Sequence, residues 1–455
     1  MLFPSFTFLL AFLPVTLAGY FLLGKKTSTG AKIWLIAASF VFYSWFNAYY
    51  FLILAASILG NYLLSLILWK YRSKAIFILG ILLNLLLLGY YKYCDFFIAN
   101  INSLFSTSIP FLKIVLPLGI SFFTFQQISF LHGVYTGTMK EKYSFITYAL
   151  FVSFFPQLVA GPIVLPEEMM PQFEKEDSLK PQARNLAAGF FVFSLGLAKK
   201  ILLADFFAEI ADSGFAGETL SFLDSWKTAL AYTFQIYFDF SGYCDMAIGL
   251  GLLFNIRLPE NFSSPYISGN IGEFWRRWHI TLGRFLKNYI YIPLGGSKKG
   301  KFHTWLNLMI TFLASGLWHG ASWLFVLWGG IHGAGLVIHN FWSRILHKKM
   351  PLLAGRLLTF LFVVIAWVLF RAENIRQAEI VYKGMFLPEK WWGSMTLFQI
   401  FLFLGGAFIV FFLPSASSRA DKFKPTWVNA VISIVLLTAS LFCFVKTSPF
   451  IYFNF

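Results

Sequence analysis

The sequence has little charge and few cysteines. Only 12% of its 455 residues are Asp, Glu, Lys or Arg, about half the charged fraction of soluble domains. This scarcity excludes an ordinary soluble globule, and we expect no nucleic-acid partner. The three cysteines, Cys94, Cys244 and Cys443, lie far apart and lack the spacing of a metal or redox motif. We therefore expect structural thiols, with no metal ion and no bound cofactor.

Hydrophobic residues take the place of charge, at 58% of the chain, and aromatic residues make up 20%. They form many apolar runs long enough to cross a hydrocarbon core of ~30 Å as a helix. The sequence therefore predicts an all-α polytopic membrane protein with one membrane domain over residues 1–455. No positive residue precedes the first run, which is expected to remain as a crossing and not to act as a signal peptide.

Positive charge exceeds negative charge, with 36 Lys and Arg against 20 Asp and Glu. Clusters of Lys and Arg typically mark cytosolic loops. The gaps between these clusters at 33–69, 75–139 and 350–418 each fit two crossings, which predicts that both termini are extracytoplasmic. The C-terminal aromatic tail, 447–455, then lies outside the cell.

Between residues 143 and 300 the apolar runs are interrupted by Pro, Gly and charged residues. Irregular backbone at membrane depth is tolerated where protein or a water-filled cavity satisfies it. A core motif region of about 150–345 is therefore the expected place of a site. Within it, 302–343 predicts a helical hairpin with His319 deep in the membrane, on a turn with glycines.

Two carboxylates lie inside an apolar segment at 235–251, namely Asp239 and Asp245. Intramembrane carboxylates are costly and usually mark function or a buried pair. The arginines at 276, 277 and 284 are their expected partners. Hydrogen bonding that holds neighbouring helices together is an equally good explanation.

The stretch 273–301 mixes aromatic residues with seven cations and His279. An interfacial amphipathic helix would explain Lys298, Lys299 and Lys301. So many cations also suit an acidic partner, such as an acyl carrier protein or the phosphates of coenzyme A.

Three histidines near one another in sequence invite a metal-site interpretation. His332 and His339 are seven residues apart on the helix that follows His319, but no carboxylate accompanies them, so a metal site is disfavoured. For His319 alone, a buried core histidine is the default. The C-terminal FIYFNF, in turn, could be an aromatic belt at the membrane surface.

Taken together, several stretches resemble the membrane-bound O-acyltransferase family, in the bacterial branch that O-acetylates alginate, peptidoglycan and related polymers. They are FFPQLVAGPI (154–163), YFDFSGYCDMAIGL (237–250), RLPENFSSPY (257–266), EFWRRWHITLGRFLKNYIYIPLGG (273–296) and GLWHGASWLFVLWGGIHG (316–333). One departure is Cys244, where the family more often has Ser.

The resemblance implies a ring of about 11 or more tilted transmembrane helices, with re-entrant and interfacial helices, around a central funnel and tunnel in the bacterial cytoplasmic membrane. It assigns catalysis to His319 and a supporting place to His279. A related D-alanylation system has an acyl-carrying tyrosine in a similar aromatic motif, which makes Tyr452 the candidate relay. The expected substrate-binding residues are Trp275, Arg276, Arg277, Trp278, Asp239, Ser241, Tyr243, Asp245, Trp318 and Trp323.

The implied function is transfer of an acetyl group from a cytosolic thioester, acetyl-CoA or an acyl-carrier phosphopantetheine, to an extracytoplasmic polysaccharide. The implied partners are the lipid bilayer, a secreted SGNH-type acetyltransferase and an acidic cytosolic acyl carrier protein. Two alternatives stay open. One is a transporter or flippase, in which the carboxylates and arginines form the substrate path. The other, a glycosyltransferase, ranks last because the first exterior loops offer only Asp95.

Overall fold

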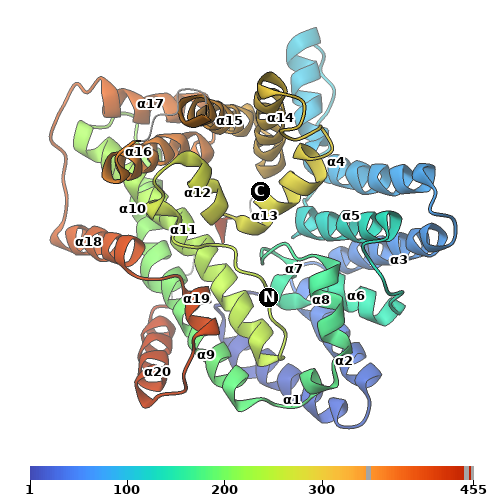
Figure 1. Cartoon of the computed structure of the whole chain (residues 1–455). Helices are drawn as coiled ribbons and strands as arrows, with labels where there is room; N and C mark the ends of the chain where they lie inside the picture. Colours follow the sequence, from blue (N-terminus) through green and yellow to red (C-terminus); the bar gives the residue numbers. More distant parts are fainter. Residues whose placement is uncertain (345–349, 445–449, 452–455) are drawn as a thin grey trace. The chain divides into compact units, whose positions relative to one another are not determined.

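The computed structural model describes residues 1–344, 350–444 and 450–451. Every regular element within these residues is a helix, which confirms the all-α prediction (Figure 1). The chain forms two compact units. Unit 1 comprises Met1–Ser194, Cys244–Pro259 and Phe423–Ile434, and unit 2 comprises Leu195–Tyr243, Glu260–Lys422 and Val435–Phe455. The single-domain assignment over 1–455 stays a prediction.

Unit 1 begins with long helices that follow the apolar runs. Its helices are η1 (Thr7–Phe12), α1 (Leu13–Gly24), α2 (Ser28–Ser44), α3 (Ala48–Tyr71), α4 (Lys74–Phe105), α5 (Ile120–Thr136), α6 (Phe145–Ser153), α7 (Phe155–Leu158), α8 (Pro166–Glu174), η2 (Glu176–Leu179) and most of α9 (Ala183–Ala198). The break expected in 33–69 is confirmed, because Asn47 caps α3 by accepting from the Tyr49 N–H. α4 runs on to Phe105 and ends where Ser106 adopts a left-handed conformation with φ of 51°.

Unit 2 contains the helices that carry most of the sequence motifs. They are η3 (Lys199–Ala204), α10 (Asp205–Phe215), most of α11 (Phe222–Leu253), η4 (Pro265–Ile267), α12 (Ile271–Arg277), α13 (Ile280–Leu286), η5 (Lys287–Tyr291), α14 (Lys301–His319), α15 (Trp323–Arg344), α16 (Leu352–Arg371), α17 (Ile375–Phe386), α18 (Leu397–Phe412) and α19 (Ala416–Asp421). The last helix, α20 (Trp427–Phe442), is shared between the units.

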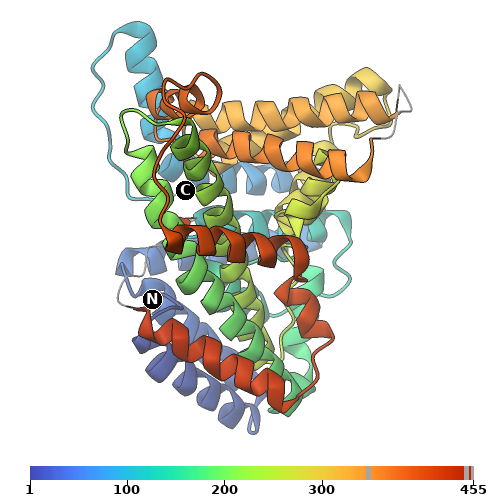
Figure 2. The same cartoon turned by 90° about the vertical axis from the view of Figure 1, so that its left-hand side faces the viewer.

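The hairpin predicted over 302–343 is confirmed by α14 and α15, which pack side by side (Figure 1). α16 packs on the other side of α15, and the two run alongside each other in orange in Figure 2. α14 and α15 approach closely because a Cβ on Gly316 would collide with the Phe325 carbonyl, and one on Gly329 with the Phe312 carbonyl. Small residues at such crossings let membrane helices pack backbone to backbone.

Six helical segments in the described residues are long and apolar enough to cross a membrane: Thr7–Gly24, Ala48–Tyr71, Lys74–Phe105, Ala183–Phe215, Trp323–Ser343 and Leu352–Arg371. α18 and α20 are shorter apolar helices. The protein is thus an all-α polytopic membrane protein, as predicted. The count of about 11 crossings, the ring with its funnel and tunnel, and the orientation of both termini stay predictions.

The irregular region predicted at 143–300 is only partly irregular. Short helices such as α7, α12 and α13 do follow the Pro and Gly interruptions. However, the region also contains the continuous helix α11, because its carboxylates do not break helical hydrogen bonding and its glycines lie at helix contacts. The Gly242 Cα, for example, faces the Gly196 carbonyl, where an added Cβ would lie 2.8 Å from the oxygen.

Candidate functional site: a histidine cluster and a buried ion pair

His319 is the last residue of α14 and is only 2% exposed. Three aromatic rings surround its imidazole, with centroid separations of 4.8 Å to Trp318, 5.1 Å to Trp328 and 5.0 Å to Phe370. Gly320 follows it in an extended conformation and ends the helix. The imidazole of His319, the residue that the sequence motifs indicate, therefore lies among aromatic rings at the end of α14. We call these rings of Trp318, Trp328 and Phe370 the aromatic box.

His279 lies between α12 and α13, outside the candidate spans, and has a left-handed backbone with φ of 46°. Such a conformation is uncommon for a residue other than glycine and often occurs at functional sites. Asn261 stabilises it, because its carbonyl oxygen accepts from the Ile280 N–H and its Oδ1 accepts from the Thr281 N–H. A short segment distant in sequence thus determines the conformation of this turn.

The same Asn261 oxygen determines the tautomer of His279. A backbone N–H can only donate, so the Asn261 atom near Thr281 is the oxygen, and His279 Nδ1 at 3.2 Å must donate to it. Burial lowers the pKa of His279 to about 3, so the ring is neutral. With its one proton on Nδ1, a neutral His279 offers Nε2 as an acceptor. In this tautomer Nε2 carries no proton that could be donated to a negatively charged substrate oxygen.

Trp318 connects the two histidines. Its ring centroid lies 6.1 Å from that of His279 and 4.8 Å from that of His319. On the other side of His279, Phe240 of α11 contacts the ring edge to face at 4.8 Å, and Trp278 packs against Phe262 beside it. The structure therefore brings His319, His279, Trp318 and Trp278 together, as the sequence motifs suggested.

Trp275 extends this cluster through a third histidine. Its indole N–H donates to His332 Nδ1 at 3.2 Å, and His332 packs against Trp328 at 4.8 Å. His332 thus accepts a hydrogen bond from an indole. One sequence signal for this contact is the tryptophan itself, since the N–H of a buried indole usually finds an acceptor.

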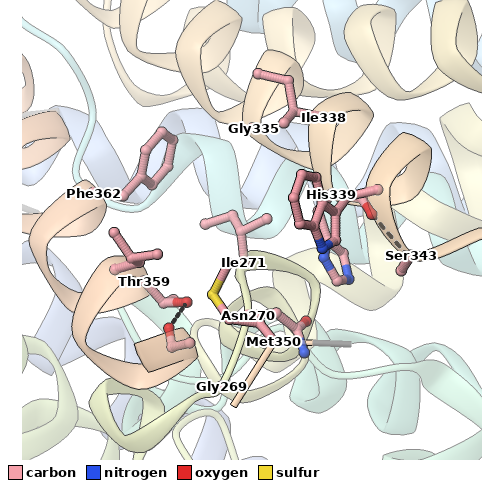
Figure 3. Close-up of a pocket in the computed structure, with 13 residues that line it drawn as sticks. Gly269, Asn270, Ile271, Gly335, Ile338, His339, Ser343, Met350, Thr359 and Phe362 are labelled. Carbon is pink, nitrogen blue, oxygen red and sulfur yellow. Dashed lines mark hydrogen bonds between the residues drawn. The ribbon is translucent and has the colours of Figure 1, made fainter. Parts of the chain in front are cut away.

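A cavity of about 640 Å³ lies beside this third histidine, between α15 and α16. Figure 3 shows Gly335, His339 and Ser343 of α15 on one side of it, with Thr359 and Phe362 of α16 facing them. Phe362 also contacts the His332 ring at 5.3 Å. The cavity is mostly apolar with a few hydrogen-bonding groups, which suits a flexible arm that carries amides.

Among the described residues, Asp239 pairs with a lysine and not with an arginine, so the expected partners at 276, 277 and 284 are wrong for this carboxylate. Its Oδ1 lies 2.6 Å from Lys200 Nζ, and both side chains are almost fully buried. Lys200 also lies 2.9 Å from Asp205 Oδ1. Sequence reasoning missed Lys200 because it sits in an apolar helix at a π-helical turn, η3, which the residue pattern does not reveal.

The neighbours of Asp239 on α11 line the same region. Lys199 Nζ lies 3.4 Å from Ser241 Oγ and 5.6 Å from the Tyr237 ring centroid. The Tyr243 ring meets that of Phe450 edge to face at 4.6 Å. The predicted residues Asp239, Ser241 and Tyr243 therefore gather around two lysines and the chain end. Asp245 is buried in unit 1 and is not placed relative to them.

The remaining predicted residues lie elsewhere. Arg277 is bound within its own segment, donating to Glu273 Oε1 at 2.9 Å and to the Ser263 carbonyl at 3.0 Å. Arg276 is exposed and Trp323 is 62% exposed. Tyr452 lies outside the described residues. A substrate-binding role for Arg276, Arg277 and Trp323 and a catalytic role for Tyr452 stay predictions.

The family model of membrane-bound O-acyltransferases matches residues 138–377, a segment that contains all three clustered histidines. The chain belongs to the membrane-bound O-acyltransferase family. It is therefore a membrane-embedded acyltransferase, and an acyl donor is one of its substrates.

Bacterial relatives extend this similarity over the rest of the chain. The chain is 42% identical to the peptidoglycan O-acetyltransferase of Helicobacter pylori, in an alignment that covers 100% of the chain and 98% of that protein. It is also 42% identical to the probable alginate O-acetylase AlgI of Pseudomonas aeruginosa, over 86% of the chain and 76% of that protein. The teichoic acid D-alanyltransferase of Bacillus subtilis is 26% identical over 61% of the chain and 75% of its own length.

Proposed function

We propose that the protein moves an acetyl group from a cytosolic thioester to an extracytoplasmic polysaccharide, such as peptidoglycan or alginate. The observation that carries this proposal is the buried cluster of His319 and His279, joined by Trp318, in a chain similar to O-acetyltransferases along its whole length. A neutral imidazole, with an unperturbed pKa of ~6.5, can accept a proton near neutral pH.

His319 is the proposed base and Tyr452 the proposed nucleophile. The phenol proton passes to the imidazole of His319 while the phenol oxygen attacks the thioester carbonyl. The tetrahedral intermediate then collapses, the C–S bond breaks, and the imidazolium returns its proton to the departing thiolate. The product is an O-acetyl-tyrosine on the chain's own tail, which a secreted SGNH-type partner uses to acetylate the polymer.

The cytosolic donor is acetyl-CoA or an acyl carrier protein. Lys298, Lys299 and Lys301 are exposed just before and at the first residue of α14, and they suit the phosphates or acidic surface of either donor. We further propose that the pantetheine arm enters the cavity between α15 and α16, because Phe362 lines that cavity and contacts His332. Ser343 and Met350 of the cavity flank a loop predicted to be cytosolic.

Acyl transfer is favoured over the transporter alternative by the family assignment, and the two make different predictions. An acyltransferase exchanges or hydrolyses the thioester in isolated membranes, whereas a transporter leaves it intact. Hydrolysis or exchange that depends on His319 would therefore decide between them.

Replacing His319 tests the proposed base directly. We expect His319→Ala to lower polymer acetylation by roughly a hundredfold or more, the usual contribution of general acid–base catalysis. The measurement is transfer of labelled acetyl to the polymer in cells or vesicles, with the inserted protein quantified by fluorescence size exclusion. The matched control is His303→Ala, which removes an exposed imidazole from the same helix. Near wild-type transfer in His319→Ala would exclude the base role.

A further inference from the structure

The last described residues of the chain are held against α11. The Ile451 N–H donates to Asp239 Oδ2 at 2.9 Å. The preceding Phe450 is only 2% exposed, with its ring edge to face on Tyr243 at 4.6 Å and 4.8 Å from Lys200 Nζ. An aromatic belt would instead place this ring at the lipid surface. The tail therefore docks in the protein, through one main-chain hydrogen bond and one buried ring.

The docking position exists because of how α9, η3 and α11 pack. The Gly242–Gly196 contact brings the two helical segments close together. The π turn of η3 follows directly, and Lys200 in it lies 2.6 Å from Asp239 and 2.9 Å from Asp205. π turns are rare and occur often at functional sites. A buried lysine between two carboxylates holds Asp239 Oδ1, so that Oδ2 can accept the tail amide.

α11 carries the docking position and the contacts to the histidine cluster on adjacent faces. Asp239 and Tyr243, four residues apart, share the face that meets the tail. Phe240, the residue after Asp239, contacts His279 at 4.8 Å. Asp239, which binds the docked tail, is therefore the direct neighbour on α11 of Phe240, which contacts the candidate catalytic cluster.

We propose that Lys200, Asp239 and Tyr243 form a binding site for the protein's own C-terminal segment, which we call the tail seat, and that this seat positions Tyr452. Tyr452 is the next residue after Ile451 in the sequence. The role given to Tyr452 rests on the proposed function, whereas the seat itself rests only on the contacts of Phe450 and Ile451. The three seat residues are positioning residues, since they hold the Ile451 amide and the Phe450 ring and not the reacting phenol.

A photo-cross-link tests whether the seat is occupied in the membrane. We expect p-benzoylphenylalanine in place of Phe450 to cross-link to the peptide that contains Tyr243, as identified by mass spectrometry. Ile451→Pro removes the donated N–H without altering the core, and Ile451→Ala retains it. A hydrogen bond to a charged acceptor corresponds to roughly tenfold or more in occupancy, so Ile451→Pro should lower the yield by about that factor while Ile451→Ala preserves the cross-link.

Asp239→Asn provides a second, independent test of the tail seat. It removes the charge on the acceptor at nearly constant volume, so it should weaken the cross-link while the protein remains inserted. An unchanged yield in both Ile451→Pro and Asp239→Asn would overturn the seat. If the cross-link responds as expected but Tyr452→Phe leaves polymer acetylation intact, the tail seat is supported and the relay role of Tyr452 is excluded. The two proposals can therefore fail separately.

Discussion

At the scale of single residues, one asparagine determines how a candidate catalytic histidine is presented. The Asn261 oxygen accepts from the Thr281 N–H, the Thr281 hydroxyl and the His279 ring at once. It therefore holds the left-handed turn at His279 and assigns the ring proton to Nδ1. The histidine is visible in the sequence, but its tautomer depends on an asparagine 18 residues earlier.

Replacing this asparagine by aspartate should change the pH dependence of transfer. Burial keeps the pKa of His279 low, and a carboxylate beside the ring would raise it by favouring the imidazolium. If the neutral ring is required, activity of Asn261→Asp falls as the pH drops through that raised pKa. The acidic limb of the rate profile should then move to higher pH by about one unit or more. The measurement is acetyl transfer in vesicles from pH 3 to 8, a range that covers the low pKa of His279 and its raised value in the variant.

The control for this variant is Asn374→Asp, which places the same charge change at the exposed N-cap of α17. Asn374 accepts from the Gln377 N–H, and aspartate is an equally good cap. Its profile should stay like that of the wild type. Identical profiles for both variants would show that the protonation state of His279 does not limit transfer.

At the scale of elements, the hairpin of α14 and α15 carries His319 and Trp328 to the same point. The helices meet through Gly316 and Gly329, one turn or less from the residues of the aromatic box. The position of the candidate base is therefore coupled to a backbone contact that tolerates no side chain.

Adding one methyl group at this contact should disturb both stability and transfer. A Cβ on Gly316 would meet the backbone of Phe325, which cannot rotate away, so we expect Gly316→Ala to destabilise the hairpin by about 1–3 kcal/mol. Thermal unfolding in detergent and acetyl transfer provide the two measurements. Gly330→Ala on the facing helix, α15, is the control, since its Cβ would meet only Leu313 at an ordinary 3.6 Å. Equal melting temperatures for both variants would contradict the close-contact argument.

At the scale of the whole molecule, the proposed function requires that reagents from two compartments meet. The proposed donor is cytosolic and the proposed acceptor is outside, so the chain must carry the acetyl group between them. The tail offers a carrier, because the seat lies on α11 beside the residue that contacts His279.

Replacing the tail phenol separates a carrier from an anchor. Tyr452→Phe keeps the apolar surface of the tail but removes the nucleophile, so polymer acetylation should be lost while the Phe450 cross-link persists. In the wild type, incubation of vesicles with labelled acetyl-CoA should yield an acetylated C-terminal peptide by mass spectrometry. His319→Ala should not form it. Full acetylation of the polymer by Tyr452→Phe would leave the tail only an anchoring role.

The sequence by itself determined the class of the fold and the catalytic candidates. Scarce charge and long apolar runs leave a chain no stable alternative to membrane helices, since lipid cannot satisfy an open backbone. The pairing of the 302–343 hairpin also follows from sequence, because its glycines and flanking basic clusters are local features.

Only the tertiary structure decided the partners of the buried polar groups. Asp239 pairs with Lys200 and the Ile451 amide, His279 with Asn261, and Trp275 with His332. These groups lie 18 to 212 residues apart, and nothing in their spacing relates one to another. A buried polar group must find a partner, but which partner it finds depends on how helices distant in sequence cross.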